Sequence, residues 1–436
     1  MLLKRTNFSQ NIPIVGIDVS KEKSDFCILD PDNKVFKRGV IKHNEESMKK
    51  SMKYFDEVNE QFGKNPICIM EATSYYHRIL YNFLINNGIE VIVINPIQSG
   101  SVKNMNIRNM KNDKIDAYRL ALLYRLGSLK PSNIPVGETA KLRSLCRYHM
   151  ALNNDLVRHM ARLTSFVEQS VPGYEKIFSK LKGSTALLIL ESYPTPVLML
   201  EADASEMVNI IKKQSHKGIE YAAEKAEQIK RIARSALDIG LKRSEDALLI
   251  PSEISVIRLI QSNIVKTDKE ITEIMKNTAF ISDMAELLKS IPGISDFSAA
   301  VLISEFADIS LFDNAKQLVA FCGLDPSQHQ SGNFNGTKTK LSKRGSPYLR
   351  FIINMIAIKN AYKQRNGKTL NPVLADYYEH KCGQKGKKAA LCAVMRKLVH
   401  IIFAVLRDKQ PFELRTPEEH IEMLKVKNQQ MIVNSA

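Results

Sequence analysis

The first hundred residues alternate short apolar runs with segments of helical periodicity. Three runs, at 12–20, 25–30 and 34–40, are rich in β-branched and aromatic residues, and the turn sequence Asp-Pro-Asp-Asn lies between the last two. Apolar residues then recur at helical spacing over 45–62 and 74–88, and further strand-like runs occupy 66–70 and 90–96. The pattern predicts three strands followed by helix, strand, helix and strand.

This order of elements predicts a mixed α/β sheet in the N-terminal region, and it is the order found in the ribonuclease H superfamily. Between residues 137 and 289 the strand signals largely disappear, so a mainly helical region follows. A chain of 436 residues is too long for one ordinary domain, and its length favours two or three.

A heptad-like apolar seam marks the end of the helical region. Its members recur at steps of three and four over fewer than three heptads: Ile257, Ile260, Ile264, Thr267, Ile271 and Ile274. The seam is typical of a coiled coil or a helical hairpin. Oligomerisation through it and packing within one chain both remain open.

Two further segments stand out in the C-terminal third. The sequence SIPGIS at 290–295 precedes a helical run, which is compatible with a phosphate-facing helix-hairpin-helix turn or with a simple turn between packed helices. Residues 325–345, DPSQHQSGNFNGTKTKLSKRG, form a polar loop between two apolar segments. Loops of this length inside a domain are usually functional or disordered, and composition cannot choose between the two.

The charge of the chain is high and clustered. The net charge is +17, of which residues 331–400 contribute +13 and residues 101–150 contribute +7, so the rest is slightly acidic. Clustering of this kind indicates a surface that binds nucleic acid, although a solvated basic face would show the same composition.

Composition and motifs argue against several other classes. The N-terminal sequence does not resemble a secretory signal, and no window offers eighteen uncharged apolar residues. The six cysteines lack the spacing of a zinc site or a disulfide framework. We therefore expect a cytoplasmic protein with reduced thiols.

Carboxylates occur at positions that need a physical reason. Asp18 lies inside the first strand-like run, and Glu71 follows an apolar run directly. Asp113 and Asp116 are three residues apart on a predicted helix and so share one face. A cap or a solvated side chain would explain any one of them. Together they form a set of hard oxygen ligands suited to Mg²⁺ and phosphoryl chemistry.

Several motifs resemble one known family. GIDVSKEKSDFCILD, CIMEATSYY, VINP and RNMKNDKIDAYRLA, with the long segment from SIPGIS to SPYLR, are similar to the DEDD-type transposases of the IS-one-ten group of insertion sequences, relatives of the Piv-type DNA invertases. The middle of the chain, about 137–285, matches by position alone. Asn112 replaces the usual threonine of one motif, and Ser295 stands where the hairpin commonly has a second glycine.

The resemblance implies three regions. They are a RuvC-like domain with a ribonuclease H fold at 1–130, a helical or coiled-coil region at 131–286, and a mainly helical C-terminal transposase domain at 287–436. It implies that the acids Asp18, Glu71, Asp113 and Asp116 bind Mg²⁺ or Mn²⁺, and that Ser331, in the QSG signature, is the nucleophile. The polar loop would then be an active-site loop.

The resemblance also implies partners. They are donor and target DNA, a structured non-coding guide ("bridge") RNA and further copies of the chain as a dimer or tetramer, in a prokaryotic, nucleoid-associated setting. Candidate contacts to nucleic acid are Lys338, Lys340, Lys343, Arg344, Arg350, Lys385, Lys387 and Lys388. His329 is a conceivable proton acceptor, and Ser327 and Ser342 are rival hydroxyls of the same loop.

Two other functions remain open at this point. A RuvC-like nuclease would use the same four acids with water as the nucleophile, so Ser331 would be dispensable. A non-catalytic nucleic-acid scaffold would keep the basic clusters but gives no reason for the placed carboxylates.

Overall fold

The computed structural model describes residues 11–72, 76–94, 113–127, 134–326, 330–331, 334–335 and 341–433. The chain divides into two compact units, residues 1–134 and 135–436, and each is described by itself. The boundary expected at 130 lies near this division. The one expected at 286 falls inside a helix of the second unit, and the three-region division stays a prediction.

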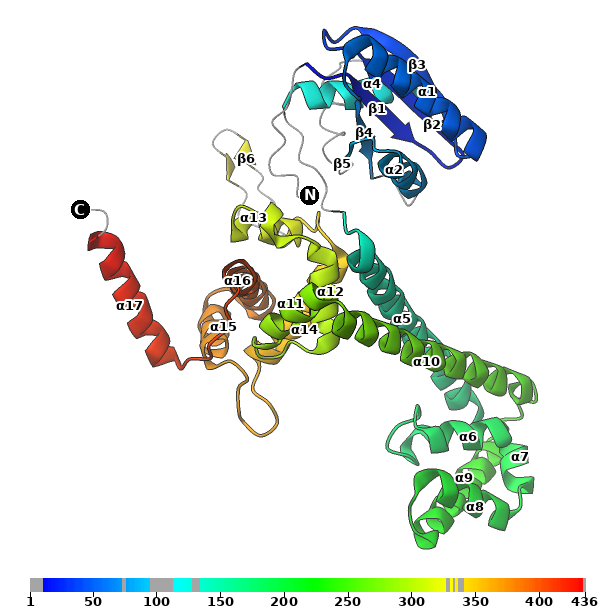
Figure 1. Ribbon diagram of the computed structural model, residues 1–436. Coiled ribbons are helices and arrows are strands. Elements are labelled where there is room, and N and C mark those ends of the chain that lie inside the picture. Colours follow the sequence, from blue (N-terminus) through cyan, green and yellow to red (C-terminus); the bar gives the residue numbers. More distant parts are fainter. Residues whose placement is uncertain are drawn as a thin grey trace. The chain divides into compact units, whose positions relative to one another are not determined.

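The first unit is built on a five-stranded sheet (Figure 1). Its strands lie in the order β3-β2-β1-β4-β5, with β1–β2 and β2–β3 antiparallel and β1–β4 and β4–β5 parallel. This is the mixed sheet that the sequence predicts. The bounds are β1 Ile14–Val19, β2 Lys23–Leu29, β3 Val35–Lys42, β4 Ile67–Glu71 and β5 Val91–Ile94.

Helices cover both faces of this sheet because its central strands are apolar on both sides. Helices α1 (Glu45–Phe62) and α2 (His77–Asn86) pack against the face that carries Val15 and Ile17. Helix α4 (Asp113–Arg125) packs against the opposite face, which carries Ile14 and Ile69. The α4-facing side of the sheet is the one that presents the predicted carboxylates.

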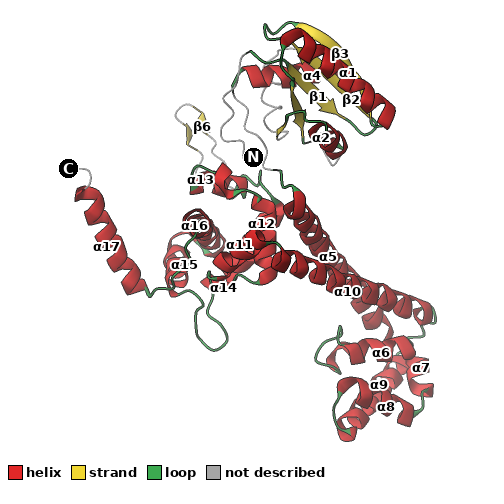
Figure 2. Cartoon of the chain, in the orientation of Figure 1, coloured by secondary structure: helices red, strands yellow, loops and turns green. Residues whose placement is uncertain are grey.

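The second unit is helical in nearly all its described elements (Figure 2). Two long helices, α5 (Gly137–Ser170) and α10 (Asp246–Asn277), pack side by side along much of their length. Five of the six seam residues on α10, Thr267 among them, are at least nine-tenths buried, whereas Ile264 is only half-buried. The seam thus packs within one chain as a helical hairpin.

A separate helical core lies at the end of this hairpin where α5 ends and α10 begins. It joins the end of α5 and the start of α10 to η1 (Tyr174–Lys176), α6 (Ser184–Ser192), α7 (Pro196–Glu201), α8 (Ala204–Ser215) and α9 (Ile219–Asp238). Tyr174 is fully buried in it and donates its hydroxyl hydrogen to the carbonyl oxygen of Ala186 at 2.8 Å.

The other ends of α5 and α10 enter a second core with the C-terminal helices. Its elements are α11 (Ala279–Lys289), α12 (Asp296–Phe306), η2 (Ile309–Leu311), α13 (Ala315–Phe321), α14 (Pro347–Ala361), α15 (Pro372–Lys385) and α16 (Lys387–Asp408), and α17 (Pro417–Val433) follows. Two short strands, β6 (Gln330–Ser331) and β7 (Phe334–Asn335), pair antiparallel between α13 and α14.

The SIPGIS segment is a turn held by packing between α11 and α12. The buried Asn360 of α14 donates a hydrogen bond to the carbonyl oxygen of Pro292 at 2.8 Å, and Ser295 caps α12. Gly293 has φ 84°, a left-handed conformation that favours glycine. These contacts favour the simple turn over a phosphate-facing one.

Two helices, α10 and α16, have the length and apolar composition of a membrane span, although the sequence predicts none. Half of the most apolar stretch of α16 is buried, and buried side chains such as Leu398 and Ile402 belong to the C-terminal core. Burial in the core therefore accounts for the hydropathy of α16. All six cysteines are free.

Candidate active site

Two predicted acids occupy equivalent places on neighbouring parallel strands. In the β1–β4 register Ile17 lies opposite Met70, and the next residues along these strands are Asp18 and Glu71. Both acids fall on the α4-facing side because side chains alternate along a strand. Asp18 is half-buried and Glu71 is 8% exposed. The sheet register alone brings these two carboxylates to one edge.

Helix α4 carries the other two predicted acids and lies close against β1. A Cβ atom at Gly16 would lie 1.9 Å from the carbonyl oxygen of Ala117, so only glycine allows this approach. At the far end of α4, Arg125 donates hydrogen bonds to the carbonyl oxygens of Ile12 (2.6 Å) and Asp30 (3.0 Å). The helix therefore runs antiparallel to β1, and its first turn lies toward the edge where β1 and β4 end.

Asp116 lies one residue before the contact with Gly16, in the N-terminal half of α4. Its carboxylate forms an ion pair with Arg119 at 3.0 Å, and both side chains are only 12–13% exposed. Asp113 is the first residue of α4, and its side chain lies outside the described residues. Among the side chains that the structure describes, no group of three or more His, Cys, Asp or Glu is close enough to hold a metal ion.

A further acid lies beside Asp18 and was missed from the sequence. Asp25 on β2 is directly opposite Asp18 in the antiparallel register and is only 4% exposed. Its carboxylate is 3.5 Å from the ammonium of Lys23, which is itself half exposed. No local signal in the sequence places it there, because its position opposite Asp18 depends on how β1 pairs with β2.

The donor set of this edge fits a hard divalent cation. Asp18, Glu71 and Asp25 supply oxygen atoms only, on one face of adjacent strands. Lys23 pairs with Asp25 of this face, and Arg119 pairs with Asp116 on α4.

The predicted nucleophile lies on the short β6–β7 hairpin of the second unit. The backbone of Ser331 pairs with that of Phe334, and the side chains of 327–340 lie outside the described residues. The predicted residues Ser327, His329, Lys338 and Lys340 are outside the described residues altogether. The described part of the loop is therefore its hairpin backbone and its base.

The base of this loop is held by backbone contacts between its two ends. Pro326 and Leu341 form an isolated antiparallel bridge, and the amide of Ser342 donates to the carbonyl oxygen of Asp325 at 2.9 Å. The hydroxyl of Ser342 also donates to the Asp325 carboxylate. This rival hydroxyl is thus engaged at the loop base.

Two glycines allow the close approach of the chain at the loop base. A Cβ atom at Gly345 would lie 1.9 Å from the carbonyl oxygen of Phe321, and Gly323 has φ 67°. Arg350 donates to the carbonyl oxygens of Gly345 at 2.7 Å and Cys322 at 3.4 Å. Arg350 is one of the predicted contacts to nucleic acid, and its Nη1 atom therefore braces the loop base.

The remaining described basic residues are exposed. Lys343, in a left-handed conformation with φ 53°, and Arg344 lie on the C-terminal side of the loop base. Lys385, Lys387 and Lys388 surround Gly386 at the junction of α15 and α16. Both groups belong to the second unit, and their contact with nucleic acid stays a prediction.

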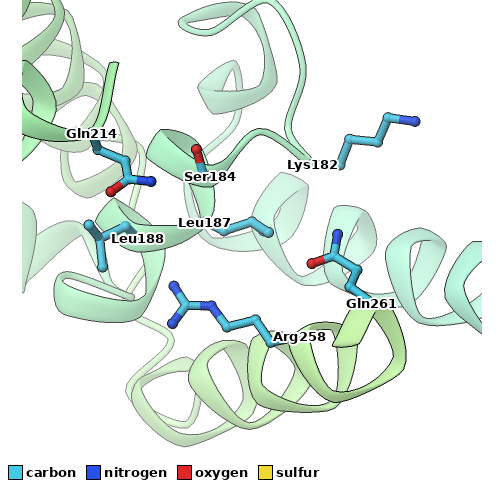
Figure 3. Close-up of a pocket in the computed structure, with 7 residues that line it drawn as sticks. All are labelled: Lys182, Ser184, Leu187, Leu188, Gln214, Arg258 and Gln261. Atoms are coloured by element: carbon cyan, nitrogen blue, oxygen red, sulfur yellow. The ribbon is translucent and has the colours of Figure 1, made fainter. Parts of the chain in front are cut away.

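A hollow of about 410 Å³ lies in the region of α6, α8 and α10 (Figure 3). Its lining residues are Lys182, Ser184, Leu187, Leu188, Gln214, Arg258 and Gln261, none of which the sequence singles out. Arg258 is ion-paired with Glu191 at 2.6 Å.

The fold and the acid edge, which is the edge of the sheet that carries Asp18 on β1 and Glu71 on β4, indicate a class of enzyme before any relative is considered. A sheet in the ribonuclease H order, with carboxylates where its two central parallel strands end, is typical of enzymes that act on nucleic acid through divalent cations. Family models extend this assignment. Residues 15–172 match a model described as a transposase, of the DEDD type of IS110, and residues 285–379 match the transposase model of the IS116/IS110/IS902 family. The chain belongs to this family of insertion-sequence transposases.

Individual relatives agree with this membership. The chain is 31% identical to the pilin gene-inverting protein of Moraxella bovis over 37% of this chain and 49% of that protein, so it spans about half the length of that relative. It is 22% identical to a 43.6 kDa protein of insertion element IS110 from Streptomyces coelicolor, over 92% of this chain and 96% of that one. It is 23% identical to the transposase of IS1111A from Coxiella burnetii, over 94% and 93%.

One solved structure is also similar. Thermus thermophilus RuvC, in complex with a Holliday junction substrate, matches 28% of this chain and 99% of its own, at 14% identity and a TM-score of 0.22.

Proposed function

We propose that this protein moves an insertion sequence by cleaving and rejoining DNA strands, with Ser331 as the nucleophile and the acid edge as a divalent-metal site. One observation carries the proposal. A single chain of this transposase family combines a carboxylate edge on a ribonuclease H-order sheet with a serine on a hairpin whose base is tightly fixed.

The acid edge supplies the metal-binding part of the chemistry. Asp18, Glu71 and Asp116, with Asp113 at the start of α4, would hold Mg²⁺ or Mn²⁺ through carboxylate oxygens. When bound, such an ion lowers the energy of the negative charge that develops at a phosphate under attack. The part of the chain itself is to keep these carboxylates at fixed places through the sheet register and the contact of α4 with Gly16.

Ser331 would form the covalent link to DNA. Its Oγ atom would attack the scissile phosphorus and lose its proton, and the bond from phosphorus to one deoxyribose oxygen would break. That oxygen leaves as a hydroxyl and takes up a proton. The phosphoserine ester conserves the energy of the broken bond, so a second DNA hydroxyl can later reverse the step and join new strands without a nucleotide cofactor.

The partners follow from the charge and from the two separate units. The basic residues Lys343, Arg344, Lys385, Lys387 and Lys388 are exposed and would neutralise phosphates of donor and target DNA. Such contacts carry no sequence information, which fits delegation of target choice to a structured guide RNA by base pairing. A nucleophile and a metal site on different units would be compatible with a site shared between protomers. The setting would be the prokaryotic nucleoid.

The test is a denaturing-gel assay for protein–DNA adducts. It uses the full-length protein, Mg²⁺, DNA with the ends of the element and RNA from its flanking non-coding sequence. We expect an adduct that Ser331→Ala abolishes and that Ser252→Ala, at an exposed position on α10, leaves intact. Mass spectrometry of the digested adduct should place the phosphate on residue 331. Modification of Ser342 in its place would reject the assigned nucleophile.

The alternative is a RuvC-like nuclease with water as the nucleophile. It predicts DNA cleavage without an adduct and full activity in Ser331→Ala, combined with loss of cleavage in Asp18→Asn. The same gel therefore separates the two functions.

A further inference from the structure

The only carboxylate at least nine-tenths buried in the described part of the C-terminal core is Glu305, on α12, and its side chain is 1% exposed. Burial of an ionised carboxylate costs several kcal/mol unless charged and hydrogen-bonding partners surround it. None of the proposed chemistry uses this residue. A buried charge in this core therefore needs another reason.

Its partners come from elements far apart in the sequence. Arg147 on α5 donates to both carboxylate oxygens, at 2.6 and 3.0 Å, and Arg143 approaches one of them at 3.4 Å. The hydroxyl of Ser346 donates to Oε2 at 3.0 Å. Burial raises the pKa of Glu305, but the hydrogen bond from Arg147 and the charges of both arginines outweigh this and bring it below its ordinary value.

Ser346 connects this cluster to the loop of Ser331. It is the N-cap of α14, the helix that follows the loop, and its amide donates to the carbonyl oxygen of Phe321, at the end of the helix that precedes the loop, at 3.3 Å. The guanidinium of Arg147 also lies 4.6 Å from the ring centroid of Tyr348, in the first turn of α14. The two helices that frame the loop thus meet at Ser346.

We propose that Glu305 is a positioning residue for the proposed nucleophile: through Ser346 it fixes the C-terminal end of the Ser331 loop to α5 and α12. The loop base then has two braces. Arg350 ties Gly345 to Cys322, and Glu305 ties Ser346 to the two arginines of α5. The buried charge serves the geometry of the loop, since an apolar pair could pack α12 on α5 but could not hold a hydroxyl in a set direction.

The inference rests on the proposed function in one respect, because it assumes that the loop presents the reacting hydroxyl. Direct replacement of Glu305 is a poor test, since it leaves Arg147 and Arg143 without their buried counter-charge and can unfold the core. Ser346→Ala leaves the pairs of Glu305 with Arg147 and Arg143 in place and removes the link between this cluster and the loop, together with the side-chain cap of α14.

The chain contains a matched control for the cap that this change also removes. Thr195 is a hydroxyl N-cap followed by proline, and its Oγ1 atom accepts a hydrogen bond from the amide of Leu198 at 3.3 Å. Ser346 is likewise followed by proline, and its Oγ atom accepts a hydrogen bond from the amide of Leu349 at 3.3 Å. Ser346 also donates a hydrogen bond to the buried carboxylate of Glu305, so the comparison of the two alanine variants isolates that link.

The first measurement is amide hydrogen exchange in the full chain without DNA. We expect Ser346→Ala to speed exchange of the amides of Ser342 and Ser346 by about tenfold or more, and Ser346→Thr, which keeps a hydroxyl, to restore protection. Thr195→Ala should leave both amides unchanged. Equal protection in Ser346→Ala and wild type would overturn the proposal.

The second measurement is the rate of adduct formation at saturating DNA, with DNA affinity measured separately. We expect a fall of about tenfold in Ser346→Ala at unchanged affinity, recovery in Ser346→Thr, and at most a twofold change in Thr195→Ala. Faster exchange with an unchanged rate would overturn the positioning role. If wild type forms no adduct at all, the proposed function fails, and the exchange comparison still decides whether Glu305 orders the loop base.

Discussion

The two units place their functional groups by different physical means. In the first unit, the acids lie on regular elements, and backbone register between β1, β2 and β4 decides which carboxylates are neighbours. In the second, the serine lies on a short hairpin between α13 and α14, and hydrogen bonds from the side chains of Ser342, Ser346 and Arg350 add to the backbone contacts that hold its base. The comparison teaches that acid placement should tolerate most side-chain changes, whereas loop placement should depend on single polar contacts.

The largest expected effect is on the acid edge itself. Asp18→Asn should lower DNA cleavage and adduct formation by at least about 100-fold, because it removes the charge of a proposed oxygen ligand without changing the register of β1. Gel assays over a range of Mg²⁺ concentrations measure the loss. Asp56→Asn, at an exposed position on α1, is the control and should keep full activity. Equal activity of the two variants would remove Asp18 from the site.

A change of packing tests the claim that backbone contact places α4. Gly16→Ala puts a methyl group where the carbonyl oxygen of Ala117 and the amide nitrogen of Ala121 already lie, so α4 must move off the sheet. We expect a loss of about 1–3 kcal/mol or more in the free energy of unfolding of the first unit. Chemical denaturation monitored by exchange of unit-1 amides measures it.

The control for this change is expected to raise the free energy of unfolding and not to lower it. Gly383 lies in α15, and a Cβ atom there meets no other atom within 4 Å. Gly383→Ala should stabilise the protein by up to about 1 kcal/mol, since alanine favours the helix. A similar effect of both substitutions would show that the contact with α4 is not tight.

A smaller effect on activity is expected at Asp25. Asp25→Asn removes a buried negative charge directly opposite Asp18, so it should weaken apparent Mg²⁺ affinity by about 10- to 100-fold while maximal activity recovers at high Mg²⁺. Titration of cleavage with Mg²⁺ separates this from Asp18→Asn, whose loss should persist at saturation. An unchanged Mg²⁺ dependence would limit Asp25 to its pair with Lys23.

The smallest expected effect concerns how the stability of the second unit depends on pH. The folded pKa of Glu305 lies below its ordinary value of 4.5, so its contribution to stability is present above that value and is lost as the pH falls through the folded pKa. Below about pH 4.5 the wild-type melting temperature should therefore approach that of Glu305→Gln, where both fold. Thermal unfolding between pH 3 and 7 tests this, and a constant difference between the two proteins would contradict it.

The sequence predicts the sheet well because its strands and helices have clear local signals. The helix expected at 45–62 is α1 with the same bounds, since Asn44 caps it and Gly63 ends it in a left-handed conformation. The five strands appear in the predicted order, within two residues of the expected bounds. Local signals could not reveal Asp25, because its importance depends on which residue faces it across β1 and β2.

The motifs of the chain determine its family and name the candidate acids and the candidate serine. The tertiary structure decides which residues hold them. Gly16 matters because α4 returns to β1 from a hundred residues away, and Glu305 matters because α5, α12 and the start of α14 meet in one core. Periodicity and motif spacing report neighbours along the chain, whereas close packing and buried charge pairs join residues whose separation in sequence carries no local signal.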